Sequence, residues 1–327
     1  MAAIELEGLT KDYGEVLAND DVTFSVERGE IFGYLGPNGA GKTTTIRTLL
    51  GLLAPTAGTA RVLGRDVTDE DALIEAKRRL GYLPDAPAFD ETATGREVLE
   101  FHAAIKGDER SEALLELFEP PLNRPIRDYS HGNVRKLGLV TTFMHDPELV
   151  ILDEPTSGLD PLIQHRFAEF LREERERGVT VFFSSHVLSE VRRLCDRVGI
   201  IRNGRLVTVE PVESLLDRSG KVVRLRAAAS IPREALAIDG VHDLETSVVR
   251  GGDADDADDA TTAVTECAFT FTGDVNSLLA HLREYRLLDL SIEEAPLEDV
   301  FMRFYGDGEE AAESASQPAL SERTGDD

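Results

Sequence analysis

The sequence predicts an α/β fold with a parallel core sheet, an antiparallel β subdomain and a helical insert, followed by a small C-terminal α+β domain. Three observations predict it. A glycine-rich, phosphate-binding pattern stands between an apolar run and a segment with helical spacing. Two later apolar runs lack alternation, which is typical of strands buried on both faces of a parallel sheet. The first residues alternate apolar and polar side chains, as half-buried strands do.

The first 35 residues carry that alternation in two segments, residues 4–6 and 22–26. Tyr13 lies in the turn between them. A lone tyrosine at such a place is usually a packing residue. Its flat ring could also stack on adenine at small entropic cost, and the residues alone leave both interpretations open.

Residues 36–44 contain the pattern G-x-x-x-x-G-K-[ST] between an expected strand and an expected helix. The glycines let consecutive backbone N–H groups surround phosphate, and the helix adds the positive end of its dipole. Lys42 would reach the β- and γ-phosphates of ATP, and the Thr43 hydroxyl would hold Mg²⁺. A glycine-rich turn with a chance lysine is the alternative, and the flanking strand and helix argue against it. This P-loop predicts nucleotide contacts from Gly36, Pro37, Asn38, Gly39, Ala40, Gly41, Lys42, Thr43 and Thr44.

Residues of about 86–146 are expected to form a helical insert, which follows a strand that runs into a loop at Asp85. Capping-box spacing starts a helix over 94–106. Further helices are expected over 109–118 and 134–145, separated by a proline-rich break.

Two apolar runs after the insert end in polar residues that suit phosphate chemistry. Asp153 ends the first run, where open α/β sheets place ligand groups, and would position Mg²⁺. Glu154 follows and could accept a proton from an attacking water. His186 follows the second run; a lone histidine is usually structural, but here it would face the same crevice. Asp160 before a proline predicts a helix N-cap.

Over residues 4–216 the chain resembles the nucleotide-binding subunit of an ABC transporter, which is an α/β P-loop NTPase. The family's motifs occur in the expected order. They are Tyr13 of the A-loop, residues 36–44 of Walker A, Asp85 at the Q-loop position, residues 129–133 of the signature, residues 149–154 of Walker B, residues 157–160 of the D-loop ending in Asp160, and the switch histidine His186.

The resemblance has departures in two motifs. The signature, usually LSGGQ, reads YSHGN here, with His131 and Asn133 at its third and fifth positions. Ser130 and Gly132, the pair that would touch γ-phosphate, are kept. The Q-loop position holds Asp85 instead of glutamine. Both departures look like those of the daunorubicin-resistance type of exporter ATPases, so the resemblance is closer to that branch.

The resemblance implies an ATP-hydrolysing subunit that powers an exporter through ATP-driven dimerisation. Glu154, His186 and Lys42 would be catalytic, and Thr43 and Asp153 would hold Mg²⁺. The expected partners are a second copy or a paralogue of this subunit and a separate membrane-spanning permease, which places the chain in the cytoplasm, peripheral on the cytoplasmic face of the cell membrane. A soluble ABC ATPase without a membrane partner is the alternative. A catalytically inactive ATP sensor is disfavoured because the catalytic residues are all present.

Residues 217–305 are expected to form the separate α+β domain, after a first domain over 1–216. Its expected elements are strands over 221–227, around Cys267, Phe269 and Phe271, and over 289–293, with helices over 275–288 and 296–305. The acidic run 251–259 fails the register of a calcium-binding EF-hand loop and is interpreted as a solvated hairpin tip. Residues 306–327 have the composition of a disordered acidic tail.

Charge composition excludes some partners and suggests a halophilic source. The chain carries 62 acidic and 35 basic residues, a net charge of −27. Such a surface does not suit nucleic acid, which requires basic patches. High net charge destabilises a compact state by self-repulsion, and molar salt screens that repulsion to within about 3 Å.

The two cysteines, far apart, fit a reducing cytoplasm. No apolar run approaches the ~18 residues that would span a bilayer.

We therefore predict that folding and activity depend on salt. Lowering the salt concentration from molar to about 10 mM should destabilise the protein, because the Debye length grows from about 3 to 30 Å. Circular dichroism melting curves across a potassium chloride series would measure this. Full folding and activity at low ionic strength would contradict the halophilic interpretation.

Overall fold

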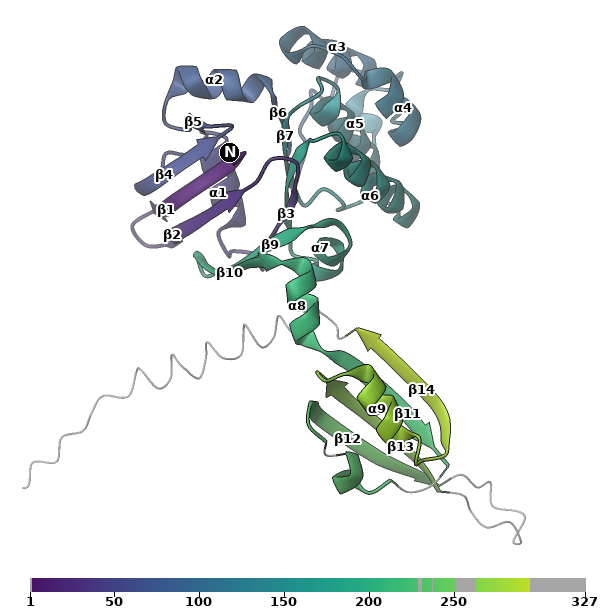
Figure 1. Cartoon of the computed structure of the whole chain (residues 1–327). Coiled ribbons are helices and arrows are strands. Elements are labelled where there is room, and N and C mark those ends of the chain that lie inside the picture. Colours follow the sequence, from purple (N-terminus) through teal and green to yellow (C-terminus); the bar gives the residue numbers. More distant parts are fainter. Residues whose placement is uncertain (1, 229–230, 237, 251–262, 295–327) are drawn as a thin grey trace, which may run out of the picture. The chain divides into compact units, whose positions relative to one another are not determined.

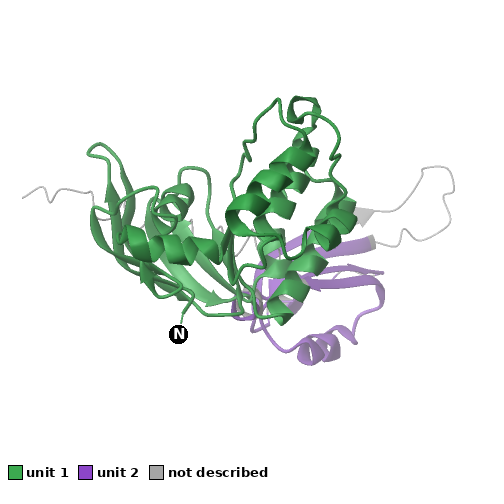
Figure 2. Cartoon of the chain, turned by 90° about the horizontal axis from the view of Figure 1, so that it is seen from above, with its two compact units in different colours: residues 1–212 green, residues 213–327 purple. Residues whose placement is uncertain are grey.

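The computed structural model describes residues 2–228, 231–236, 238–250 and 263–294. The chain divides into two compact units, residues 1–212 and 213–327 (Figure 2). The boundary predicted after residue 216 lies inside the helix α8 (Val212–Ser219). The predicted helix over 296–305, the acidic run 251–259 and the tail 306–327 lie outside the described residues.

A six-stranded sheet with the order β10-β9-β3-β8-β7-β6 forms the centre of the first unit (Figure 1). Its strands are β3 (Ile31–Leu35), β6 (Leu80–Leu83), β7 (Leu149–Asp153), β8 (Thr180–Ser185), β9 (Arg197–Arg202) and β10 (Arg205–Pro211). All neighbours are parallel except β9 and β10, which form an antiparallel hairpin. Strands β3, β7 and β8 are buried along their whole length, which confirms the parallel core predicted from their unbroken apolar runs.

A second sheet with the order β2-β1-β4-β5 is entirely antiparallel, as the alternating N-terminal sequence predicts. Its strands are β1 (Ile4–Asp12), β2 (Leu17–Val26), β4 (Ala57–Val62) and β5 (Arg65–Asp66). Aromatic side chains join the two sheets. The ring of Phe24 in β2 stacks on Phe32 in β3 at 5.2 Å, and Phe32 in turn stacks on Phe182 in β8 at 6.0 Å. The main core therefore lies where the two sheets meet.

Seven helices connect the described strands of the first unit. They are α1 (Lys42–Leu49), α2 (Glu70–Arg78), α3 (Gly95–Lys106), α4 (Ser111–Phe118), α5 (His131–Phe143), α6 (Pro161–Glu176) and α7 (Leu188–Leu194), with a 3₁₀ turn at Ile126–Asp128. Helices α3, α4 and α5 form the predicted insert and lie together in Figure 1. The capping box at Thr94 is confirmed, since Thr94 and Glu97 satisfy each other's backbone N–H groups.

Helix α5 begins earlier than the sequence suggested. The predicted start at residue 134 is wrong: the helix begins at His131, because the hydroxyl of Ser130 accepts the backbone N–H of Asn133 at 3.3 Å and caps it. The signature segment therefore forms the first turn of α5.

The described part of the second unit contains, after α8, an antiparallel sheet with the order β12-β13-β11-β14, on which the helix α9 packs. Its elements are β11 (Lys221–Ala227), a 3₁₀ turn at Arg233–Leu236, β12 (Val241–Arg250), β13 (Ala263–Phe271), α9 (Val275–Leu282) and β14 (Leu287–Glu294). Phe269 and Phe271 are buried together with Leu278 of α9, as their shared strand face predicts. The predicted end of the helix at residue 288 is wrong, because Leu287 is extended and pairs with Ala227 in β11.

A buried carboxylate ties the insert to α6. Glu174 is 1% exposed and accepts two hydrogen bonds from the Arg110 guanidinium, at 2.6 and 2.7 Å, beside the start of α4. Arg177 donates a third at 3.1 Å. These charge-assisted bonds compensate the desolvation of Glu174.

We predict that Glu174→Gln lowers the free energy of unfolding by about 2 kcal/mol, because it removes the buried carboxylate that accepts from Arg110 and Arg177 and leaves these arginines with the exposed Asp146 as their acidic partner. Urea denaturation in high salt would measure the change. The exposed neighbour Glu173 provides the control, as Glu173→Gln should change stability by less than about 0.5 kcal/mol. Equal effects of the two substitutions would contradict this role of the cluster.

Candidate functional site

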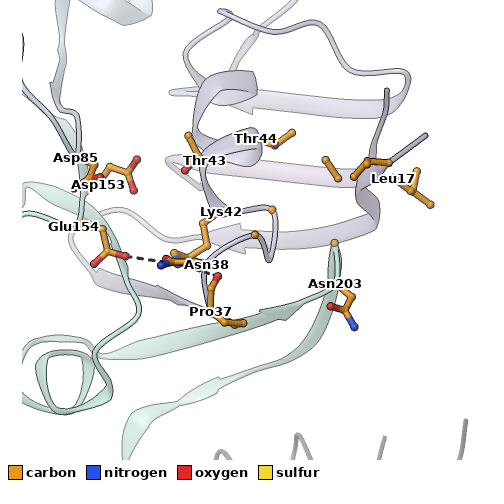
Figure 3. A pocket seen from close by; sticks show the side chains of 15 residues that line it. Leu17, Pro37, Asn38, Lys42, Thr43, Thr44, Asp85, Asp153, Glu154 and Asn203 are labelled. Atoms are coloured by element: carbon orange, nitrogen blue, oxygen red, sulfur yellow. Dashed lines mark hydrogen bonds and ion pairs between the residues drawn. The ribbon is translucent and has the colours of Figure 1, made fainter. Parts of the chain in front are cut away.

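A cavity of about 450 Å³ lies where the parallel strands end (Figure 3). The register sets its position: Leu35 of β3 pairs with Ser185 of β8, and Ser184 pairs with Asp153 of β7. The residues that follow these strands therefore begin at one edge of the sheet. The cavity is lined by Val16, Leu17, Ala18, Pro37, Asn38, Gly39, Gly41, Lys42, Thr43, Thr44, Asp85, Asp153, Glu154, Asn203 and Gly204.

The loop between β3 and α1 requires glycine at its two ends. Gly41 has φ +107°, and a Cβ atom there would lie 2.3 Å from the carbonyl oxygen of Ala18. At Gly36 a Cβ atom would lie 2.5 Å from the carbonyl oxygen of Ile201. Both glycines let the loop lie close against its neighbours, and α1 begins directly afterwards at Lys42. The loop thus presents backbone N–H groups and a helix N-terminus to the cavity, which favours an anion.

The side chain of Lys42 folds back against this loop. Its side chain is 7% exposed, and its Nζ atom donates to the carbonyl oxygen of Gly36 at 2.5 Å. The same ammonium lies 3.6 Å from Oε1 of Glu154. A buried ammonium in this arrangement is preorganised to meet a phosphate group.

Glu154 joins the P-loop to His186. Its Oε2 atom shares a hydrogen bond with Nδ1 of His186 at 2.9 Å, while Oε1 faces Lys42. Glu154 has φ +48°, a left-handed conformation that costs a non-glycine residue on the order of 1 kcal/mol. Its backbone N–H donates to the carbonyl oxygen of Ser184 at 3.0 Å, which holds this turn in place. The carboxylate is thereby aimed between a lysine and a histidine.

Asp153 supplies a buried carboxylate next to Glu154. It is 4% exposed, and burial raises its pKa above the ordinary value, with a further rise from the charge of Glu154. A nearby cation would favour its ionised form. The Thr43 hydroxyl lines the same cavity, so the available donors are oxygens of the kind that Mg²⁺ prefers. These residues fit a bound magnesium ion.

Arg135 is a buried residue of the site that sequence reasoning missed. It lies in α5, is 5% exposed, and donates to the carbonyl oxygens of Pro84, at 3.1 Å, and of Asp85. Its guanidinium also lies 3.5 Å from the Asp85 carboxylate. Burial lowers the pKa of Arg135. Arg135 thus connects α5 to the Asp85 loop. No local pattern marks it, since an arginine in a helix is ordinarily exposed.

The predicted adenine platform lies outside the lining of the cavity. Tyr13 is 55% exposed, and the Lys11 ammonium lies 5.3 Å from the centre of its ring. Val16, Leu17 and Asn203 line the cavity instead. Asn203-Gly204 is a hairpin-turn signal between β9 and β10 that could have located the turn, but its packing against the P-loop is a tertiary contact. The stacking role of Tyr13 stays a prediction.

The remaining predicted residues also lie outside the cavity lining. Gly36 and Ala40 belong to the P-loop but do not line the cavity. Ser130 caps α5, and Asp160 caps α6 by accepting the Ile163 backbone N–H at 3.0 Å, as predicted. Gly132 is close to the D-loop, since a Cβ atom there would lie 2.9 Å from the carbonyl oxygen of Gly158. His186 reaches the cavity only through Glu154.

No group of three or more histidine, cysteine, aspartate or glutamate side chains among the described residues could hold a metal ion. None of the helices that the structure describes has the length and apolarity needed to cross a membrane.

The sequence and the structure of this chain are similar to those of one family of known proteins. A sequence profile of the family described as ABC transporter matches residues 19–157. A bacitracin transport ATP-binding protein of Bacillus licheniformis is 38% identical, with 68% of this chain and 74% of that protein covered. A Nod factor export ATP-binding protein of Mesorhizobium japonicum is 33% identical, with 93% and 87% covered. A solved structure of an ATP-binding subunit of an ABC transporter superposes with a TM-score of 0.62 at 32% identity, covering 66% of this chain and 92% of that one.

Proposed function

This chain belongs to the ATP-binding subunits of the ABC transporter family, which are ATPases, and we propose that it powers an exporter. The observation that supports ATP hydrolysis as the source of that power is Glu154, which lies between Lys42 and His186 beside the phosphate-binding loop. A relative named for bacitracin transport supports a role in transport, and one named for Nod factor export supports its direction.

Each group of residues in the cavity would have its own role in hydrolysis. The backbone N–H groups of the P-loop and the Lys42 ammonium would bind the β- and γ-phosphates and stabilise their charge in the transition state. Glu154 would accept the proton of the attacking water, and His186 would orient the Glu154 carboxylate and contact the γ-phosphate. Thr43 and Asp153 would hold Mg²⁺, which neutralises phosphate charge when it is bound.

A second copy or a paralogue would complete the site. Ser130 and Gly132 lie at the N-terminus of α5, where backbone N–H groups attract anions, yet they do not line the cavity of their own chain. Their predicted contact with γ-phosphate therefore calls for another chain. ATP would join the two strongly acidic subunits, and hydrolysis would release them by removing the γ-phosphate contacts.

The membrane partner would be a separate permease, which would hold this chain at the cytoplasmic face of the cell membrane. His131, Asn133 and Asp85, which replace the usual residues of the signature and Q-loop, favour the daunorubicin-resistance branch. A soluble ABC ATPase is the competing function.

If the chain powers an exporter, an affinity-tagged form purified from detergent-solubilised host membranes in high salt should bring down a stoichiometric polytopic membrane protein. Soluble partners alone, or a chain that stays in the cytosol, would favour the competing function.

We predict that Glu154→Gln lowers the turnover number for ATP by about 10²- to 10⁴-fold, because the amide cannot accept the proton of water. Binding of ATP should be retained, since the phosphate-binding loop is unchanged. Phosphate release and fluorescent-nucleotide titration in high salt would measure the two quantities. Glu169→Gln, an exposed substitution on α6, is the matched control and should leave turnover unchanged. Near-normal turnover of Glu154→Gln would refute the assignment of the base.

A further inference from the structure

One carboxylate outside the motifs joins the two loops that carry Glu154 and His186. Glu190 lies in α7, and one of its carboxylate oxygens accepts a hydrogen bond from the Thr156 hydroxyl. The other accepts a hydrogen bond from the Ser185 hydroxyl at 2.9 Å. The two donors are buried, with Thr156 4% exposed and Ser185 fully buried, while Glu190 itself is partly buried.

The two donors stand beside the catalytic pair. Thr156 lies two residues after Glu154 in the loop that follows β7. Ser185 directly precedes His186 at the end of β8 and also accepts the backbone N–H of Val187 at 2.9 Å, which shapes the turn around the histidine. The loops meet through the hydrogen bond between Glu154 and His186, and a second time through Glu190.

The chemistry of this bridge suits a carboxylate. Two hydroxyl donors that point at one side chain are satisfied by a group that accepts at two oxygens and donates nothing, and an ionised carboxylate is such a group. Hydrogen bonds to a charged acceptor are about twice as strong as neutral ones. Glutamine would keep the length and one acceptor oxygen, whereas alanine would remove the acceptor of the Thr156 hydroxyl and leave Ser185 with its contacts to Val187 alone.

We propose that Glu190 is a positioning residue for hydrolysis, which fixes the distance between the loops of Glu154 and His186. The inference rests on the proposed roles of those two residues in the ATPase site. Glu190 touches neither the cavity nor the P-loop. Its removal therefore affects the alignment of the catalytic pair and leaves the binding of phosphate intact.

The test compares kinetic constants of full-length variants in high salt. Glu190→Ala should lower the turnover number about 10- to 100-fold, the cost of misplacing a catalytic group by about 1 Å, while KM for ATP changes less than about twofold. Glu190→Gln should recover most of the lost turnover. Thr156→Val keeps the shape of threonine but removes one donor, so it should lower turnover by itself and add little in the Glu190→Ala background. Glu169→Gln is again the control.

Hydrogen exchange supplies a readout that does not depend on turnover. In Glu190→Ala, the amides of residues 154–160 and of 185–187 should exchange faster together, while the P-loop amides keep their rates. Unchanged exchange in both loops, unchanged turnover, or a KM that rises in step with the loss of turnover would overturn the role of Glu190. A wild-type protein without ATPase activity would instead overturn the proposed function, and the exchange result would still decide whether Glu190 joins the loops.

Discussion

The contacts of Glu154 with Lys42 and His186 are the constraint on which the structure of the first unit depends. Each residue follows a different strand of the parallel sheet, β3, β7 and β8 respectively (Figure 3 shows Lys42 and Glu154). The contacts exist only if these strands are neighbours, in register and directed the same way. The aromatic stack of Phe24, Phe32 and Phe182 holds the sheet against the antiparallel subdomain, so packing far from the cavity sets its geometry.

Buried charges around the cavity compensate one another. Lys42 and Arg135 are cations that are each less than a tenth exposed, and Asp153 and Glu154 are the carboxylates near them. Burying a single charge without a partner would cost much free energy, but here hydrogen-bond donors and acceptors from several elements compensate the lost hydration. Arg135 bonds to backbone carbonyls of the Asp85 loop, and Lys42 to those of the P-loop.

Local patterns predicted several elements well and others poorly, for identifiable reasons. The capping box at Thr94 and the N-cap at Asp160 are short-range signals, and both are present. The start of α5 was placed three residues late because Ser130 caps the helix inside a glycine-containing segment that reads as a loop. Helix α9 was predicted to run through Leu287 because its apolar spacing continues, but pairing with β11 takes that residue into a strand.

The chemistry proposed for this protein could be predicted from short patterns: the P-loop, the acids that end one apolar strand and the histidine that ends another. The residues that surround these groups follow from the way the chain folds. The buried Arg135, the bond from Thr156 to Glu190 and the Asn203 turn at the edge of the cavity join segments that are far apart in the chain. Such contacts depend on which strands become neighbours in the sheet, and that order is not contained in any short pattern of side chains.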